Sequence, residues 1–136
     1  MTQPAVIQLD QLYAHAPAAV WRALTDPALH AQWWAAGDVK AEVGHTFELD
    51  MGPWGKQACE VVAVEPERLF QYRFAKGRLD TVITWRLTPE GDGTRLTLTH
   101  EGFDLDSPMG RMAFEGMKPG WPGLLVKLGA VAGAPG

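Results

Sequence analysis

Hydrophobic and polar residues alternate along several stretches of the chain, which is the pattern of half-buried β-strands. The alternation is strictest at 46–51, where every second residue is apolar, and Phe70, Tyr72 and Phe74 share one face of another such stretch. The pattern predicts strands at 6–13, 46–51, 56–64, 69–74, 81–87 and 94–100. Because short turns join most of the later strands, neighbouring strands are expected to pair antiparallel.

Two short helices are expected after the first strand. Residues 18–25 follow Pro17, and proline suits the first turn of a helix, where its missing N–H would be unpaired in any case. Residues 27–34 follow Asp26, whose side chain is a favourable N-cap. Gly37 ends this second helical pattern.

The C-terminal stretch carries an apolar stripe at the spacing of one helical face. The stripe predicts a helix over 121–131 and consists of Trp121, Leu124, Leu125, Leu128 and Val131. A further turn or two of helix is expected at 107–115, but Pro119 and Gly120 predict a break between the two segments. Gly129 predicts that the last helix is short or bent.

A single amphipathic helix of this length is marginal in water, so its apolar stripe must be buried against the strands. The expected fold is therefore α+β, with a curved antiparallel sheet that wraps around the C-terminal helix and leaves a cavity between them. One domain is expected over 1–136, with a flexible tail of small residues at 132–136.

Composition and charge narrow the classes of partner. The chain has a formal net charge of -4, and its basic residues are scattered, whereas nucleic-acid binding needs clustered lysine and arginine. Cys59 is the single cysteine, so no intramolecular disulfide can form and a reducing compartment, the cytoplasm, is expected. No apolar run approaches the roughly 18 residues of a membrane span, and the N-terminus lacks the pattern of an export signal.

A series of short motifs extends over the whole chain in order. They are Ala16-Pro17 with Val20-Trp21, Leu24-Thr25-Asp26-Pro27, Trp33-Trp34, Pro66-Glu67-Arg68-Leu69, Leu98-Thr99-His100-Glu101-Gly102-Phe103, and Gly120-Trp121 with Leu124 and Leu128. Together they resemble the START/polyketide-cyclase (SRPBCC) superfamily, and within it the branch similar to the C-terminal domain of the activator of the heat-shock-protein-90 ATPase. The resemblance implies a helix-grip fold over a central cavity. It implies no particular reaction, because the superfamily holds lipid carriers, cyclases and co-chaperone domains.

The leading hypothesis is binding of a small apolar or aromatic ligand, lipid-like or polyketide-like, in that cavity. The side chains expected to line it are those of Phe47, Met51, Trp54, Tyr72, Phe74, Trp85, His100, Trp121 and Leu125, with Trp34 near the mouth. Met51, Met109, Met112 and Met117 could supply an adaptable wall, with gap-filling in the core as the alternative use of each. For the tryptophans, core packing is the competing interpretation.

Two other classes of function stay open. A cyclase-type or hydrolase-type enzyme would use His100 or Tyr72 as its acid or base in the cavity, although both residue types also occur as buried, hydrogen-bonded core residues. The other is a chaperone-interaction, or stress-response, module, with a chaperone or a second copy of the chain as partner. No nucleophile elbow or phosphate loop appears, and no histidine has a metal ligand at the usual spacing, so no cofactor or metal ion is expected.

Overall fold

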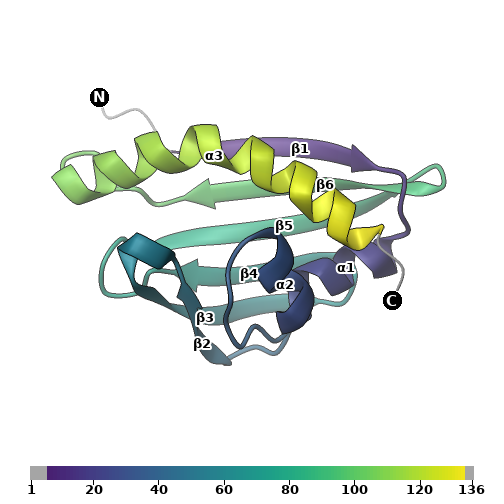
Figure 1. The fold of residues 1–136 in the computed structure, drawn as a ribbon, viewed down its shortest axis with the longest axis horizontal. Helices are drawn as coiled ribbons and strands as arrows, with labels where there is room; N and C mark the ends of the chain where they lie inside the picture. The colour runs from purple at the N-terminus through teal and green to yellow at the C-terminus, as the bar shows by residue number, and fades with distance from the viewer. Residues whose placement is uncertain (1–5, 134–136) are drawn as a thin grey trace.

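The computed structural model describes residues 6–133 of the 136-residue chain, and within them the chain is α+β, as predicted (Figure 1). Its elements are β1 (Ile7–Tyr13), α1 (Pro17–Thr25), α2 (Pro27–Trp33), β2 (Thr46–Asp50), a 3-10 turn η1 (Gly52–Trp54), β3 (Lys56–Glu65), β4 (Leu69–Phe74), β5 (Thr81–Glu90), β6 (Gly93–Glu101) and α3 (Pro108–Ala132). The N-terminal residues examined for an export signal and most of the expected C-terminal tail lie outside the described part, while Ala132 belongs to α3. No helix of the described part is both long and apolar enough to cross a membrane.

The strands form one antiparallel sheet in the order β1-β6-β5-β4-β3-β2. All three helices lie on one face of it, and α3 runs along the β1 and β6 side (Figure 1). The register of β3 with β4 shifts between Val61 and Ala63, so that Val62 is an extra residue in the ladder. Such a bulge bends its strand and adds twist, which helps the sheet to curve around the helices. This is the helix-grip arrangement that the sequence motifs implied.

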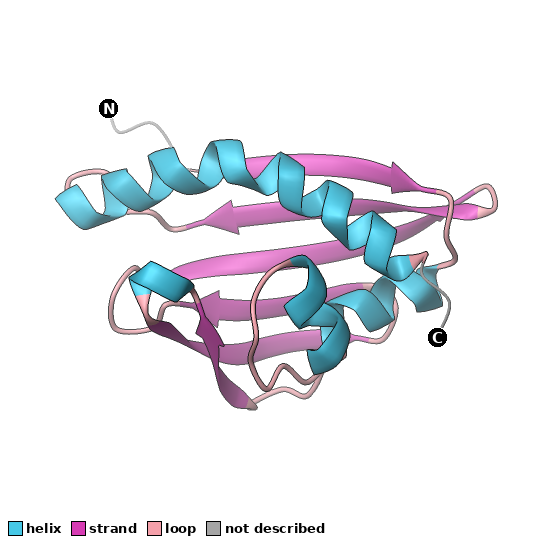
Figure 2. Ribbon diagram, viewed as in Figure 1, coloured by secondary structure: helices cyan, strands magenta, loops and turns pink. Residues whose placement is uncertain are grey.

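The predicted break before the last helix is wrong, because α3 is one helix of 25 residues that contains Pro119 and Pro122 (Figure 2). Each proline lacks the N–H that would bond to the carbonyl four residues earlier, on Glu115 and Lys118 respectively. These two residues and both prolines are exposed, so water can satisfy the freed carbonyls. Burial of Trp121 and the apolar residues that follow it offsets the local cost.

Gly129 has a low helix propensity but a specific packing role. A Cβ atom at this position would lie 2.7 Å from Cε1 of Tyr13, so only glycine lets the Tyr13 ring approach the helix this closely. The Tyr13 hydroxyl then donates a hydrogen bond of 2.6 Å to the backbone oxygen of Leu125. The sequence predicted that Gly129 shortens or bends the helix. Instead α3 continues past Gly129 to Ala132, and at Gly129 it packs against the end of β1.

Candidate functional site

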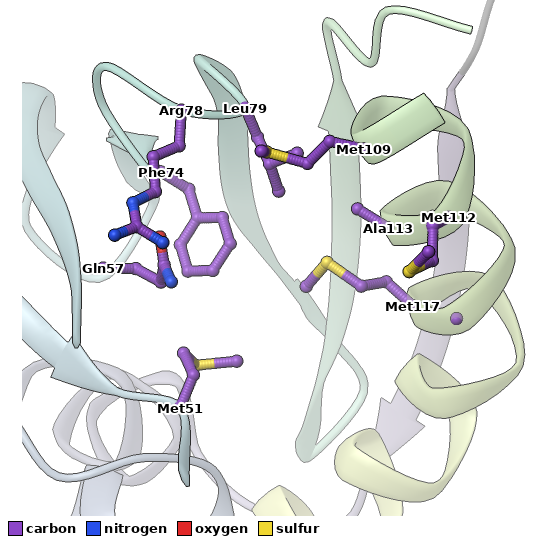
Figure 3. A pocket seen from close by; sticks show the side chains of 10 residues that line it. Met51, Gln57, Phe74, Arg78, Leu79, Met109, Met112, Ala113 and Met117 are labelled. Carbon is purple, nitrogen blue, oxygen red and sulfur yellow. The ribbon is translucent and has the colours of Figure 1, made fainter. Parts of the chain in front are cut away.

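A cavity of about 440 Å³ lies between the first half of α3, the ends of β2 and β4, and the turn that joins β4 to β5 (Figure 3). Its volume falls in the range of roughly 300–1,000 Å³ that is usual for small-molecule sites. Met109 and Met112 at its rim are 53% and 60% exposed, so it opens to solvent. The lining residues are Met51, Gln57, Phe74, Arg78, Leu79, Met109, Met112, Ala113, Gly116 and Met117.

The first half of α3 (108–120) forms one wall of the cavity. Its lining residues follow the i, i+3, i+4, i+7, i+8 spacing that puts side chains on one helical face. The helix begins where the sequence predicts, because Ser107 accepts a hydrogen bond of 3.4 Å from the N–H of Gly110 and Pro108 occupies the first turn. All the methionines of residues 6–133, namely Met51, Met109, Met112 and Met117, line the cavity.

The turn between β4 and β5 supplies Arg78 and Leu79. The backbone oxygen of Ala75 accepts hydrogen bonds of 3.0 Å from the N–H groups of Arg78, Leu79 and Asp80, and the Asp80 carboxylate accepts one of 2.8 Å from Gly77. Ala75 and Asp80 have φ angles of 58° and 50°, in the left-handed region that non-glycine residues seldom adopt. A strained but heavily bonded turn thus fixes the backbone from which Arg78 reaches the cavity.

The floor of the cavity is continuous with the aromatic core. Phe74 faces the cavity and also contacts Trp34 and His100, with ring centroids 5.6 and 5.7 Å away. Trp34 is half-buried and lies 4.9 Å from the Trp121 ring. The aromatic side chains at the floor of the cavity therefore also belong to the packed core that stabilises the fold.

His100 belongs to that layer and uses both ring nitrogens. The indole N–H of Trp121 donates to Nδ1 at 3.2 Å, so the ring proton is on Nε2, which donates to the Thr81 hydroxyl at 2.9 Å. Thr81 in turn donates to the backbone oxygen of Phe74 at 3.2 Å. Burial lowers the pKa of His100 to about 3, which keeps the ring neutral near pH 7. This arrangement suits a structural hydrogen-bond chain better than an acid or base.

Tyr72 is similarly enclosed. Its hydroxyl accepts a hydrogen bond of 3.2 Å from the indole N–H of Trp85, and burial raises the pKa of the phenol. Burial also raises the pKa of the Cys59 thiol to about 12, which disfavours the thiolate that a nucleophile needs. Among residues 6–133 no group of three His, Cys, Asp or Glu side chains has the arrangement of a metal site.

The structure divides the residues predicted to line the cavity into several groups. Met51 and Phe74 line it, and Trp34 is half-buried beside Phe74. The side chain of Trp54 is outside the part that the structure describes. The others are buried in the core and do not line this cavity; they are Phe47, Tyr72, Trp85, His100, Trp121 and Leu125.

The sequence indicated part of the wall that α3 supplies. It offers Met109, Met112 and Met117 as an adaptable wall, with gap-filling in the core as the alternative, and the structure places all three at the cavity. The sequence does not mark Ala113 and Gly116, which lie on the same face of α3. Gln57 alternates with Cys59 and Val61 on β3, a spacing that points it inward. Nothing in the sequence marks Arg78 and Leu79, since a turn has no periodicity.

The polar chemistry of the cavity is sparse. Of the described residues that line it, only Gln57 and Arg78 have polar side chains, and neither is an acid or base that titrates near neutral pH. The arrangement can therefore enclose an apolar molecule and contact one polar group on it.

Comparison with known proteins agrees with the fold. A model of the family described as "Activator of Hsp90 ATPase homolog 1-like protein" matches residues 14–133. Protein MLL2253 from Mesorhizobium loti is 35% identical over 93% of this chain and 95% of its own, with a TM-score of 0.81. Protein BH1534 from Bacillus halodurans is 26% identical over 97% of this chain and 99% of its own, with a TM-score of 0.81. CalU16 from Micromonospora echinospora is 27% identical over 98% of this chain and 82% of its own, with a TM-score of 0.76. No curated protein matches the chain.

Proposed function

The chain belongs to the family of Activator of Hsp90 ATPase homolog 1-like proteins, and from its cavity we propose that it binds a small apolar or aromatic molecule, lipid-like or polyketide-like, between the sheet and the first half of α3. The observation that carries this proposal is the cavity of about 440 Å³ with its mostly apolar lining. Transfer of the apolar surface of a ligand from water into such a cavity is the main source of binding affinity.

The methionine wall supports the proposal. Unbranched thioether side chains adapt to ligands of different shape and make favourable contacts with aromatic rings. On the opposite side Phe74 offers a fixed aromatic surface. Because no described lining residue is suited to proton transfer near neutral pH, binding accounts for the cavity better than catalysis does.

The neutral fluorophore phenylnaphthylamine (NPN) tests the proposal in titrations of the purified protein. Ala113 points into the cavity (Figure 3), so Ala113→Phe should fill it and weaken NPN binding by about tenfold or more. Ala130→Phe is the matched control, because Ala130 is exposed on the same helix. Circular dichroism checks that both variants fold. Absence of saturable NPN binding, or equal binding by both variants, would contradict the proposal.

Native mass spectrometry followed by organic extraction would identify a natural ligand. A defined compound that co-purifies with the wild-type protein and with Ala130→Phe, but not with Ala113→Phe, would name the ligand class. Retention by both variants would show that the compound is not held in this cavity.

A second function for the same region is contact with a chaperone of the Hsp90 type, as the family's description suggests. The observation in its favour is that Met109 and Met112 expose apolar surface at the cavity rim, which is how interaction sites often look. The ATPase rate of a purified Hsp90 with and without this protein tests it. An unchanged rate, or a stimulation that survives the double change Met109→Gln and Met112→Gln, would contradict a chaperone contact at this surface.

A further inference from the structure

Arg78 is the one charged residue among the described residues that line the cavity. An arginine side chain carries a positive charge and a planar set of N–H donors. No carboxylate of residues 6–133 forms an ion pair with it within 4.0 Å. Arg95, by contrast, is paired with both Glu90 and Asp10. The chain therefore neutralises Arg95 internally and leaves the Arg78 charge at the cavity without such a partner.

The two polar side chains among the described residues of the cavity lie together, across from the methionine wall of α3. In Figure 3 the Arg78 guanidinium lies on the same side as the Gln57 amide, across the cavity from Met117 and Ala113 of α3. The site is thus amphipathic, with the Arg78 cation beside the Phe74 ring on one side and the thioethers of α3 on the other. Arg78 is exposed, so its guanidinium can reach a ligand anion at the solvent-facing side of the cavity, where a charge-assisted hydrogen bond is stronger than a neutral one.

The turn that carries Arg78 fixes its backbone before any ligand arrives. Left-handed φ angles at two non-glycine residues, Ala75 and Asp80, are held by three hydrogen bonds to one carbonyl. Backbone strain of this kind tends to occur where a site needs a defined geometry. Because the backbone of the turn is already ordered, binding restricts only the Arg78 side chain, and less conformational freedom is lost.

The nearby carboxylates do not occupy the place that a ligand anion would take. Asp80 accepts a hydrogen bond from the N–H of Gly77 within the turn. Asp80 and Asp104 line a second, smaller cleft that Arg78 also borders, and neither lines the main cavity. They weaken the field of the guanidinium without filling the cavity.

From these observations we propose that the molecule bound in the cavity is an anionic amphiphile, such as an apolar or aromatic acid, whose charged group is held by Arg78 while its body lies along the methionine wall. This inference rests on the ligand-binding function proposed above. It adds to that function the chemical class of the ligand and the residue that selects it.

Anilinonaphthalene sulfonate (ANS) and NPN test the inference, because they share one aromatic body and differ by a single sulfonate. Arg78→Gln should weaken ANS binding about tenfold and leave NPN binding within about twofold of the wild-type value. Arg78→Lys should retain part of the ANS affinity, since it keeps the charge but loses the two-pronged geometry. Arg86→Gln is the matched control, because Arg86 is exposed between two buried residues of β5 and the change in net charge is the same.

The outcomes separate the two proposals. If NPN binds normally and Arg78→Gln affects ANS no more than Arg86→Gln does, the cavity binds apolar molecules but the preference for anions is wrong. If ANS binding survives Ala113→Phe while NPN binding is lost, the sulfonate binds elsewhere and the inference also fails. If neither probe binds the folded wild-type protein, the ligand-binding function itself fails.

Discussion

Trp121, Leu125 and Leu128 in the second half of α3 (121–132) are buried, whereas Met109 and Met112 in its first half are 53% and 60% exposed. The buried half is part of the core of the domain. The exposed half forms one side of a cavity instead of filling it. The comparison shows that one helix can stabilise the fold over part of its length and leave the rest available for a ligand.

The two halves meet in a segment that is a poor helix former. Gly116, Pro119, Gly120, Pro122 and Gly123 all fall within a few residues of each other inside α3. A Cβ atom at any of these glycines would meet nothing within 4 Å, so packing does not require them. These residues therefore lower the helix propensity of the junction without serving a packing role. Tertiary contacts of the second half must stabilise the helix there.

The largest difference between the halves is expected from large-to-small substitution. Trp121→Ala should lower the free energy of unfolding by about 3–5 kcal/mol, because it leaves a cavity in the core and removes the donor to His100. Met112→Ala in the exposed half should lower it by less than about 1 kcal/mol. Urea denaturation measures both. Similar losses in the two variants would contradict the division of α3 proposed here.

A smaller loss of stability is expected at acidic pH, because His100 joins the second half of α3 to the sheet. Its pKa is lowered to about 3 in the folded protein, so below about pH 6.5 the unfolded chain binds a proton that the folded protein excludes. Stability should therefore fall as pH decreases from about 6.5 towards 3, with a loss of about 2 kcal/mol from His100 between about pH 7 and 5.

His30 contributes in the same direction, because burial lowers its pKa as well. Comparison of the wild-type protein with His100→Gln isolates the share of His100, since glutamine can still accept and donate a hydrogen bond but does not titrate. The free energy of unfolding of the variant should depend less steeply on pH. An identical pH dependence in both proteins would show that protonation of His100 does not limit stability.

The sequence predicted the strands and the two short helices well because those elements depend on local patterns. Alternation is visible along β2 and β4, and the side chain of Asp26 accepts hydrogen bonds from Ala28 and Leu29 as an N-cap should. The break at Pro119 was wrong because proline acts locally, whereas the contacts that keep the helix intact are distant in sequence. Trp121, for example, packs against Trp85 with ring centroids 5.6 Å apart.

The site was harder to predict than the fold, for a related reason. Alternation shows which face of a strand a residue occupies but not how deep it lies. Tyr72 and Phe74 share one face of β4, yet only Phe74, at the end of the strand, lines the cavity. Arg78 belongs to a turn whose shape depends on hydrogen bonds to Ala75, and no periodic pattern in the sequence predicts its position at the cavity.

Glycine substitutions should change stability in opposite directions in the two halves. Gly129→Ala forces a methyl group against the Tyr13 ring, which its bond to Leu125 holds in position, so a net loss of about 1–2 kcal/mol is expected. Gly120→Ala meets no neighbour and should gain up to about 1 kcal/mol from helix propensity. Thermal unfolding followed by circular dichroism measures both. A gain at both positions would show that the contact between β1 and α3 is not rigid.

The last two substitutions are expected to change stability least, and they distinguish the two halves of α3 by their effect on ligand binding. Met112→Gln and Val126→Gln each replace an exposed apolar residue of α3, so both should leave the free energy of unfolding within about 0.5 kcal/mol of the wild-type value. Only Met112 lines the cavity, so only Met112→Gln should weaken NPN binding, by about threefold or more. If Val126→Gln weakened binding equally, the probe would sense the whole helix, and the first half would have no special role.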